Sequence, residues 1–383
     1  LWAYIAGVYG DDAVVDLFRY SLRAGWEPAL ETVLGEVSDS ISADWARAVK
    51  AEYLPLMEGR TPPGEAGKLL QAPSTGGGAQ NLAPALSPDG TRMVFMSEKG
   101  LFSFDLYLAD VQTGKIIRTL SSSSADPHFD ALRFVDSSGS WSWDGTRLVY
   151  VVFADGDNQL VLADADDGTI RKWVGIRDIG AIQGPSWSPD GKSIVFSGTK
   201  GGITDLFVYD VDSEATTQLT DDWYADFQPV FSPDGKSVAF ITDRSEASDR
   251  ARLTYAKFQL GLLDLESGRV SSLPVFGPEV KHINPQFSPD GESLYFISDV
   301  DGFSDVYRLG LVSGSVERIT RVATAVSGIT WSAPAMSVAQ RDGRMVFSVF
   351  DEFEFHLYGL DPAEVDRAAE LVAQAEPGPG RLL

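Results

Sequence analysis

Histidines and carboxylates are the side chains of this chain that could carry out acid–base or metal chemistry. The sequence holds 3 histidines, at positions 128, 282 and 356, against 55 acidic residues and no cysteine. Without cysteine, thiol catalysis, disulfides and cysteine-bound metals are excluded. A Gly-x-Ser-x-Gly elbow, which presents the nucleophile of α/β-hydrolases, does not occur. The sequence therefore predicts no catalytic residue, although carboxylate pairs brought together only in space stay open.

Two clusters have partial metal-ligand spacing. Asp299, Asp301 and Asp305 bracket a glycine as in calcium loops, but no glutamate follows at the required distance. Glu352, Glu354 and His356 alternate along one face of an expected strand, yet one strand supplies only three ligands. Solvated turns and strand hydrogen bonds explain both clusters, so we expect neither a metal nor another cofactor.

A turn sequence repeats along the chain and organises everything else. Its proline presets φ, its aspartate bonds the local backbone, and its glycine accepts a positive φ. The clear copies are Ser87-Pro88-Asp89-Gly90, Ser188-Pro189-Asp190-Gly191, Ser232-Pro233-Asp234-Gly235 and Ser288-Pro289-Asp290-Gly291. A degenerate copy is Ser142-Trp143-Asp144-Gly145, and a split copy is Trp331-Ser332 with Asp342-Gly343, interrupted by an insertion at 333–341 that we expect among the hairpin turns.

Two apolar runs of strand type follow each turn, and the anchor serines recur every 44 to 56 residues. This spacing is at or just above the period of a four-stranded propeller blade. The sequence therefore predicts an all-β six-bladed β-propeller at 79–362 with a small N-terminal α-helical segment. The last copy lacks a fourth strand, so we expect Lys68–Gln71 or Gly78–Leu82 to supply it and close the ring.

Several polar or aromatic residues are candidates for ligand binding at the mouth of the central channel. The expected starts of the six innermost strands, three positions before the strand proline or the residue in its place, are Asn81, Asp136, Ile182, Asp226, His282 and Val326. The four polar residues among them, Asn81, Asp136, Asp226 and His282, either ring the mouth or satisfy buried backbone amides. Nearby loops add His128, Phe129, Trp223 and Tyr224, the last two of which could instead pack between blades. Long insertions at 121–138 and 242–258 should lie on this same face.

The Ser-Pro-Asp-Gly turns, the aromatic-ended strands and the run Asp105-Leu-Tyr-Leu-Ala-Asp110 resemble TolB-like propellers, relatives of the WD-repeat group. The resemblance covers 79–362. It implies a noncatalytic domain that binds a peptide or protein segment, in a periplasmic or otherwise exported setting. The same repeats also occur as accessory domains of peptidases.

The segment 1–57 has helical apolar spacing, and it is followed by a Pro/Gly-rich linker at 58–78; a C-terminal tail occupies 363–383. The stretches YIAGVYG and DWARAVKAEYL resemble the helical tail of gluzincin-type zinc peptidases, whose His-Glu-x-x-His ligands are missing here. The alternative function is therefore a substrate-filtering accessory domain of a zinc metallopeptidase whose catalytic lobe precedes residue 1.

The net charge of the chain limits the kinds of molecule that it can bind. The formal net charge is −24 and the isoelectric point is near 4.4, so the long-range field repels nucleic acid and anionic lipid. No apolar run is long enough to cross a bilayer, so we expect no direct membrane insertion. A peptide or protein partner fits best, and a polysaccharide-processing propeller is a third possibility that would need a groove of carboxylates and tryptophans.

Overall fold

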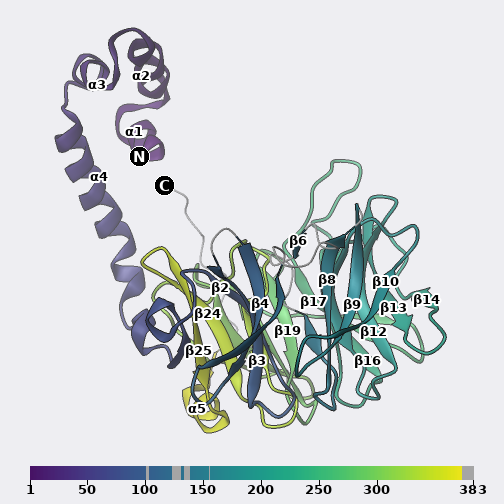
Figure 1. The fold of residues 1–383 in the computed structure, drawn as a ribbon. Helices are drawn as coiled ribbons and strands as arrows, with labels where there is room; N and C mark the ends of the chain where they lie inside the picture. Colours follow the sequence, from purple (N-terminus) through teal and green to yellow (C-terminus); the bar gives the residue numbers. More distant parts are fainter. Residues whose placement is uncertain (101–102, 123–130, 133–138, 155, 373–383) are drawn as a thin grey trace. The chain divides into compact units, whose positions relative to one another are not determined.

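The computed structural model describes residues 1–100, 103–122, 131–132, 139–154 and 156–372 (Figure 1). These residues divide into a helical unit, 1–60, and a propeller unit that begins at Thr61. No helix in the described ranges is both long and apolar enough to cross a membrane.

The helical unit holds four α-helices. They are α1 (Trp2–Tyr9), α2 (Asp11–Ala24), α3 (Trp26–Leu34) and α4 (Ser38–Tyr53), followed by the short 3₁₀ turn η1 (Pro55–Met57). The first three helices each end at a glycine of positive φ, and at Gly35 this is the left-handed cap that glycine favours. A small core joins the helices through Ile5, Leu17, Ala29, Leu30 and Ile41.

The propeller consists of six antiparallel sheets, which confirms the predicted fold. Blade 1 contains β2 (Asn81–Leu86), β3 (Arg92–Gly100), β4 (Ser103–Asp110) and β5 (Ile116–Ser122). Blade 2 contains β6 (Ala131–Leu132), β7 (Ser140–Trp141), β8 (Arg147–Ala154), β9 (Asp157–Asp164) and β10 (Ile170–Gly175). Blade 3 contains β11 (Ile182–Trp187), β12 (Ser193–Lys200), β13 (Ile203–Asp210) and β14 (Thr216–Gln218).

The remaining blades complete the ring (Figure 1). Blade 4 contains β15 (Asp226–Phe231), β16 (Ser237–Thr242), β17 (Gln259–Asp264) and β18 (Val270–Leu273). Blade 5 contains β19 (His282–Phe287), β20 (Ser293–Ser298), β21 (Asp305–Gly310) and β22 (Val316–Arg318). Blade 6 contains β23 (Met336–Val338), β24 (Met345–Asp351) and β25 (Glu354–Leu360).

Blade 6 takes its outer strand from the beginning of the propeller unit. β1 (Lys68–Gln71), flanked by the 3₁₀ turns η2 (Pro63–Glu65) and η3 (Pro73–Thr75), pairs antiparallel with β25. Leu69 faces Tyr358 in this register, and the Leu70 side chain is buried. The prediction that a segment near residues 68–71 closes the ring is confirmed, and the segment assigned to the linker thus contains a strand of the last blade.

The chain after β25 returns to the propeller and packs against blade 5. Helix α5 (Pro362–Ala368) buries Val365 in the core, and β26 (Glu370–Leu371) pairs with β22 as a fifth strand of blade 5. Arg308 of β21 donates to Asp366 of α5 at 2.8 Å. One exposed sheet edge is therefore covered by this chain's own segment.

The repeated turns are held as their sequence predicts. In blade 3 the Ser188 hydroxyl donates to Asp190 at 2.6 Å, and the Lys192 amide donates to the same carboxylate oxygen at 3.1 Å. These bonds lower the pKa of Asp190. After each turn, the second strand buries an aromatic ring between blades: Phe95, Tyr150, Phe196, Phe240, Phe296 and Phe347.

The sixth copy of the repeat is arranged differently from the prediction. Residues 333–341 do not interrupt a hairpin at the turn end, because they contain β23, the innermost strand of blade 6. The turn itself lies at 339–343, where the Gly343 amide donates to the Ala339 carbonyl. Trp331 and Ser332 therefore precede the innermost strand instead of ending it, which moves them to the opposite end of the blade.

Candidate functional site

A β-bulge shapes the innermost strand of four blades. The residue before the strand proline has a positive φ at Ala83, Gly184, Gln228 and Asn284, and the ladder to the second strand skips there. A bulge of this kind bends the strand and redirects a side chain. The proline consequently reaches the central channel in each of these blades, and in blades 3, 4 and 5 the residue before it does so too.

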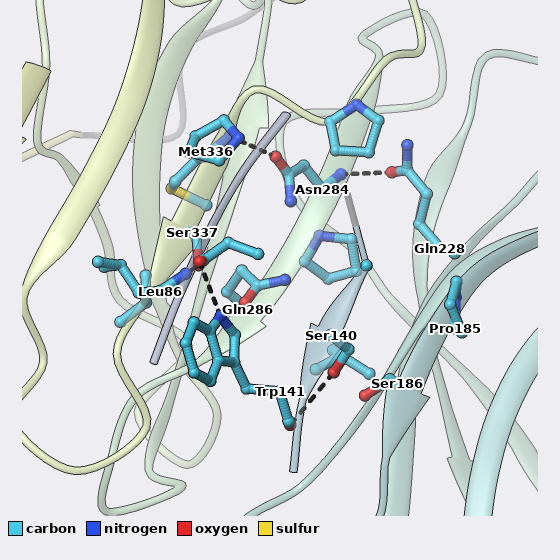
Figure 2. Close-up of a pocket in the computed structure, with 18 of the residues that line it drawn as sticks. Leu86, Ser140, Trp141, Pro185, Ser186, Gln228, Asn284, Gln286, Met336 and Ser337 are labelled. Carbon is cyan, nitrogen blue, oxygen red and sulfur yellow. Dashed lines mark hydrogen bonds between the residues drawn. The ribbon is translucent and has the colours of Figure 1, made fainter. Parts of the chain in front are cut away.

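Two amide side chains from these bulges tie three blades together around the channel (Figure 2). Gln228 accepts a bond from the Asn284 amide at 2.7 Å and donates to the Ser332 carbonyl at 2.7 Å. Asn284 in turn accepts bonds from the backbone amides of Ala335 and Met336 at 2.8 and 2.7 Å. The channel wall from blade 4 to blade 6 is thus fixed by side chains that cap otherwise unpaired backbone groups.

The channel is narrow and uncharged. It has a volume of about 100 Å³ and is lined by residues of all six innermost strands. No described residue in its wall is ionisable; the polar groups are amides and hydroxyls such as Gln286, Gln340 and Ser186. Because one water needs about 10–15 Å³ on this measure, the channel has room for a few waters and not for a polypeptide.

A wider pocket adjoins the channel. It measures about 200 Å³ and shares Gly184, Gln228 and Pro334 with the channel wall. Phe227 pairs with Ile241 close to the end of β16, so the pocket lies at the end of the propeller from which the 243–258 loop emerges. We call this end the mouth; the Ser-Pro-Asp-Gly turns lie at the other end.

Three aromatic side chains form the apolar wall of the mouth pocket. The rings of Phe258 and Trp331 stack with centroids 5.5 Å apart and planes 9° from parallel. Phe227 meets Phe258 edge to face at 5.4 Å. Trp331 is 63% exposed although it belongs to this cluster, which is an unusual position for so large an apolar side chain.

A buried lysine supports the exposed tryptophan. The Lys281 ammonium donates to the Trp331 carbonyl at 2.7 Å and lies 5.9 Å from the centre of its ring. The lysine is 9% exposed, and its own backbone amide donates to Asp299 at 2.9 Å. The carbonyl of Trp331 is therefore held by a charged donor while its ring faces solvent.

Asn81 and His282 occupy the predicted places at the start of innermost strands, and both are fully buried. The Asn81 amide donates to the carbonyls of Gly78 and Phe355 at 2.7 and 2.9 Å. The His282 Nε2–H donates to the Val275 carbonyl at 2.8 Å, and burial lowers the pKa of His282 to about 4. These contacts favour the structural role over direct contact with a ligand.

Asp226 is likewise fully buried and belongs to a charged network. Arg244 donates to both of its carboxylate oxygens and also to Asp222 at 2.7 Å. Burial and the neighbouring Asp226 charge raise the pKa of Asp205 to about 6. The network joins the third strand of blade 3 to blade 4, so Asp226 fastens two blades at the mouth.

The other predicted residues divide into two groups. Trp223 and Tyr224 are half-buried, their ring centroids are 3.9 Å apart, and the Arg244 guanidinium lies 5.5 Å from the Tyr224 ring. His128, Phe129 and Asp136 lie outside the described residues. Of the five predicted residues that the structure describes, none lines the mouth pocket.

Trp331 is the residue that the sequence analysis missed. In blade 6 the place of Asp226 and His282 is held by the buried Val326, which pairs with Val349 as His282 pairs with Ser298. Trp331 lies among extra residues between this bridge and β23, and a tryptophan in that longer stretch is the signal that could have identified it. Phe258 lies at the end of the 242–258 insertion that the sequence did assign to this face.

The residues that line the mouth pocket are suited to binding an apolar side chain and a peptide backbone. An apolar side chain can enter the pocket against Phe258 and Trp331 and displace water from their rings. The polar groups within reach are Gln183, Gln228 and Ser332 at the pocket wall, which can hydrogen-bond a peptide backbone. In the described ranges no three acidic or histidine side chains gather closely enough to hold a metal ion.

The comparisons with known proteins agree with the fold. Residues 135–256 match the family model described as the TolB beta propeller domain. The Tol-Pal system protein TolB of Bordetella pertussis is 29% identical over 174 residues, which are 44% of this chain and 36% of that protein. The uncharacterized peptidase YuxL of Bacillus subtilis is 28% identical over 230 residues, which are 58% of this chain and 30% of that protein.

This chain thus spans about a third of the length of those two relatives. Among solved structures, a putative TolB from Agrobacterium tumefaciens superposes with a TM-score of 0.52 at 19% identity. That superposition covers 73% of this chain and 90% of the other. The repeat and the six sheets show that the described residues between 61 and 372 form a six-bladed β-propeller, of which residues 135–256 are similar to the TolB beta propeller domain.

Proposed function

We propose that this propeller is a noncatalytic module that binds a peptide or protein segment at its mouth. The observation that carries the proposal is the aromatic pocket beside the channel, where Trp331 is 63% exposed next to the partly buried Phe227 and Phe258. Exposed tryptophans around a concave apolar site are typical of binding hot spots. The match to a protein of a Tol-Pal system supports a partner of protein type.

The fixed backbone around the pocket favours recognition of an extended segment. Gln228 and Asn284 lock the wall from blade 4 to blade 6, so the pocket exists before a ligand arrives. Preorganisation reduces the entropic cost of binding. Aromatic burial supplies most of the affinity, and the amides of the wall orient the bound backbone.

The test is selection of short peptides from a random display library on the full chain, followed by titration of the synthetic peptides. Trp331→Ala should weaken the selected peptides by about 2–4 kcal/mol, as at other hot spots. Trp173→Ala makes the same chemical change on the outer strand of blade 2 and should leave the affinity unchanged. Equal affinity for wild type and Trp331→Ala would refute the proposal.

A second function is favoured by the match to a peptidase. The propeller would then filter substrates for a peptidase domain in the same protein, and the N-terminal helices would be the remainder of a zinc-peptidase lobe. Because the described residues hold no cluster of metal ligands, this chain by itself should not cleave casein. Chelator-sensitive cleavage by the purified chain would contradict this expectation.

The proposed setting is the periplasm or another exported compartment. The similarity to a Tol-Pal protein supports this location. Fractionation of cells that express the complete gene tests it: recovery with the periplasmic fraction is expected, and recovery with the cytosol would contradict the proposal.

A further inference from the structure

The loop between β16 and β17, residues 243–258, exposes apolar side chains beside the mouth pocket. Leu253 is 70% exposed and Tyr255 is 68% exposed, and the same loop ends in Phe258 of the pocket wall. Leu253 also has a φ of 54°, which a leucine adopts only when its surroundings enforce it. The loop thus extends the apolar surface of the pocket outward.

Hydrogen bonds hold this loop in place. Near its tip the Asp249 amide donates to the Thr254 carbonyl at 2.9 Å, and the Thr254 amide donates back at 3.1 Å. At its base, Asp243 accepts a bond from the Ala225 amide at 2.7 Å and its carbonyl accepts one from the Ser248 hydroxyl at 2.6 Å. The exposed side chains are therefore carried on an ordered support.

The tip of the loop is basic in a strongly acidic protein. The chain carries a formal charge of −24, yet residues 250–257 contain Arg250, Arg252 and Lys257 and no acidic residue. Arg252 has a solvent-exposed pair with Asp249 at 3.6 Å, which contributes little. Within the described part of the chain no ion pair neutralises Arg250 or Lys257. Glu246 is the other exposed charge of the loop.

The positive charge continues to the pocket. Burial, reinforced by the charge of Lys257, lowers the pKa of Lys281, whereas Asp299 acts in the opposite direction. Lys281 and Lys257 are therefore close enough to repel each other next to Trp331. Two acidic groups at the base of the loop, Asp222 and Asp226, are paired with Arg244.

We infer that the segment bound at the mouth is acidic: an aromatic or leucine side chain enters the pocket while flanking aspartates or glutamates face Arg250, Arg252 and Lys257. This inference rests on the proposed function and adds the chemistry of the partner. Charge complementarity of this kind sets specificity and the association rate. A lipid surface fits less well, because the rest of the chain repels anionic membranes and the pocket is concave.

The experiment uses the full chain and the peptides selected from the random library. Selected peptides should combine an aromatic residue or leucine with several acidic residues. The variant with both Arg250→Glu and Lys257→Glu should bind them about tenfold or more weakly at low salt, and the wild-type affinity should fall as salt increases.

The matched control reverses two charges at the opposite end of the same blade. Lys236→Glu with Arg269→Glu changes the net charge equally, but these exposed residues lie in the turns after β15 and β17. This control should keep the affinity within about twofold, because only the local field of the loop matters. An equal loss in both double variants would show a general charge effect and overturn the inference.

Other outcomes separate the inference from the proposed function. Peptides that lose affinity with Trp331→Ala but show no acidic bias and no effect of the loop charges refute the acidic partner alone. Selected peptides that bind wild type and Trp331→Ala with the same affinity would refute the proposed site itself. Loop-dependent sedimentation with phosphatidylglycerol vesicles in the absence of any selected peptide would replace the partner by a lipid surface. Loop-dependent self-association in light scattering would replace it by a second copy of the chain.

Discussion

The two ends of the propeller are built on different principles. At the turn end, one short sequence is repeated with nearly the same hydrogen bonds in each blade, as with Ser232 and Asp234 in blade 4 and Ser288 and Asp290 in blade 5. At the mouth, the residue three positions before the strand proline changes from blade to blade, from Asn81 to Asp226 and His282. The repeated turns help to close the ring, whereas the residues at the mouth differ between blades, and blade 6 carries the exposed Trp331 there.

The comparison teaches that equivalent positions need not have equivalent roles. In blades 1, 4 and 5 the position holds a buried, hydrogen-bonded polar side chain, whereas in blade 6 it holds the buried, apolar Val326, and the exposed Trp331 follows five residues later. We therefore expect substitutions at the mouth to divide into those that destabilise the fold and those that only impair binding.

The largest effect should come from Asp226→Ala. Removing this carboxylate leaves the mostly buried Arg244 without its main partner, and an uncompensated buried charge costs about 3–5 kcal/mol of unfolding free energy. Thermal and urea melts measure the loss. Asp221→Ala, an exposed carboxylate on the same crossing loop, is the control and should change stability by less than about 0.5 kcal/mol.

A pH-dependent effect of similar size is expected at His282. Because burial lowers the pKa of this histidine from 6.5 to about 4, the unfolded chain binds a proton between these values and the folded protein does not. Stability from this group is thus complete above pH 6.5 and falls as the pH drops toward 4, by about 3 kcal/mol. The stability advantage of wild type over His282→Gln should shrink by that amount between pH 7 and pH 4.

Asp205 provides a control of opposite sign. Its pKa is raised to about 6, so the folded protein takes up a proton before the unfolded chain does, and this group favours folding increasingly as the pH falls from 6. The stability of Asp205→Asn relative to wild type should therefore decrease on acidification. If the free energy of unfolding changed with pH in the same way for wild type, His282→Gln and Asp205→Asn, neither group would titrate as described.

Smaller effects are expected at the turn end. Asp234→Ala removes the acceptor of bonds from the Ser232 hydroxyl and the Lys236 amide, and in this exposed turn the loss should be about 1 kcal/mol. These bonds lower the pKa of Asp234, so the contribution is present above its ordinary pKa and disappears as the pH falls through the lowered value. Melts at pH 7 and pH 2.5 should show the difference at the higher pH only.

The ring of blades could be predicted from sequence because the turn residues have a local cause. Pro189, Asp190 and Gly191 specify their turn whatever surrounds them, and the missing fourth strand of blade 6 called for a segment near Lys68. The mouth could not be predicted in the same way. Burial of Asp226 and His282 depends on how the crossing loops fold over them, as where the carbonyl of Val275, seven residues before His282, accepts a bond from its ring.

The sequence analysis missed the mouth pocket because it placed the sixth copy of the repeat in the wrong register. In the sixth copy, Trp331-Ser332 resembles the Trp187-Ser188 pair that ends an innermost strand, and this likeness assigned it to the turn end. The true strand begins at Met336, after Pro334, so the same dipeptide lies at the mouth. Pro334 lies nine positions before Gly343, whereas Pro185 lies six positions before Gly191, and this difference changes the end of the blade at which the Trp-Ser pair lies.

The smallest effect on stability should come from Trp331→Ala, and it is the sharpest test of the comparison. The ring is largely exposed and stacks on Phe258, while its backbone carbonyl, which a substitution retains, accepts the Lys281 bond. We expect a loss of less than about 1 kcal/mol in urea melts, because only one face of the ring is buried. A loss as large as that of Asp226→Ala would mean that Trp331 fastens blades together as Asp226 does, and that the mouth pocket has no residue devoted to binding.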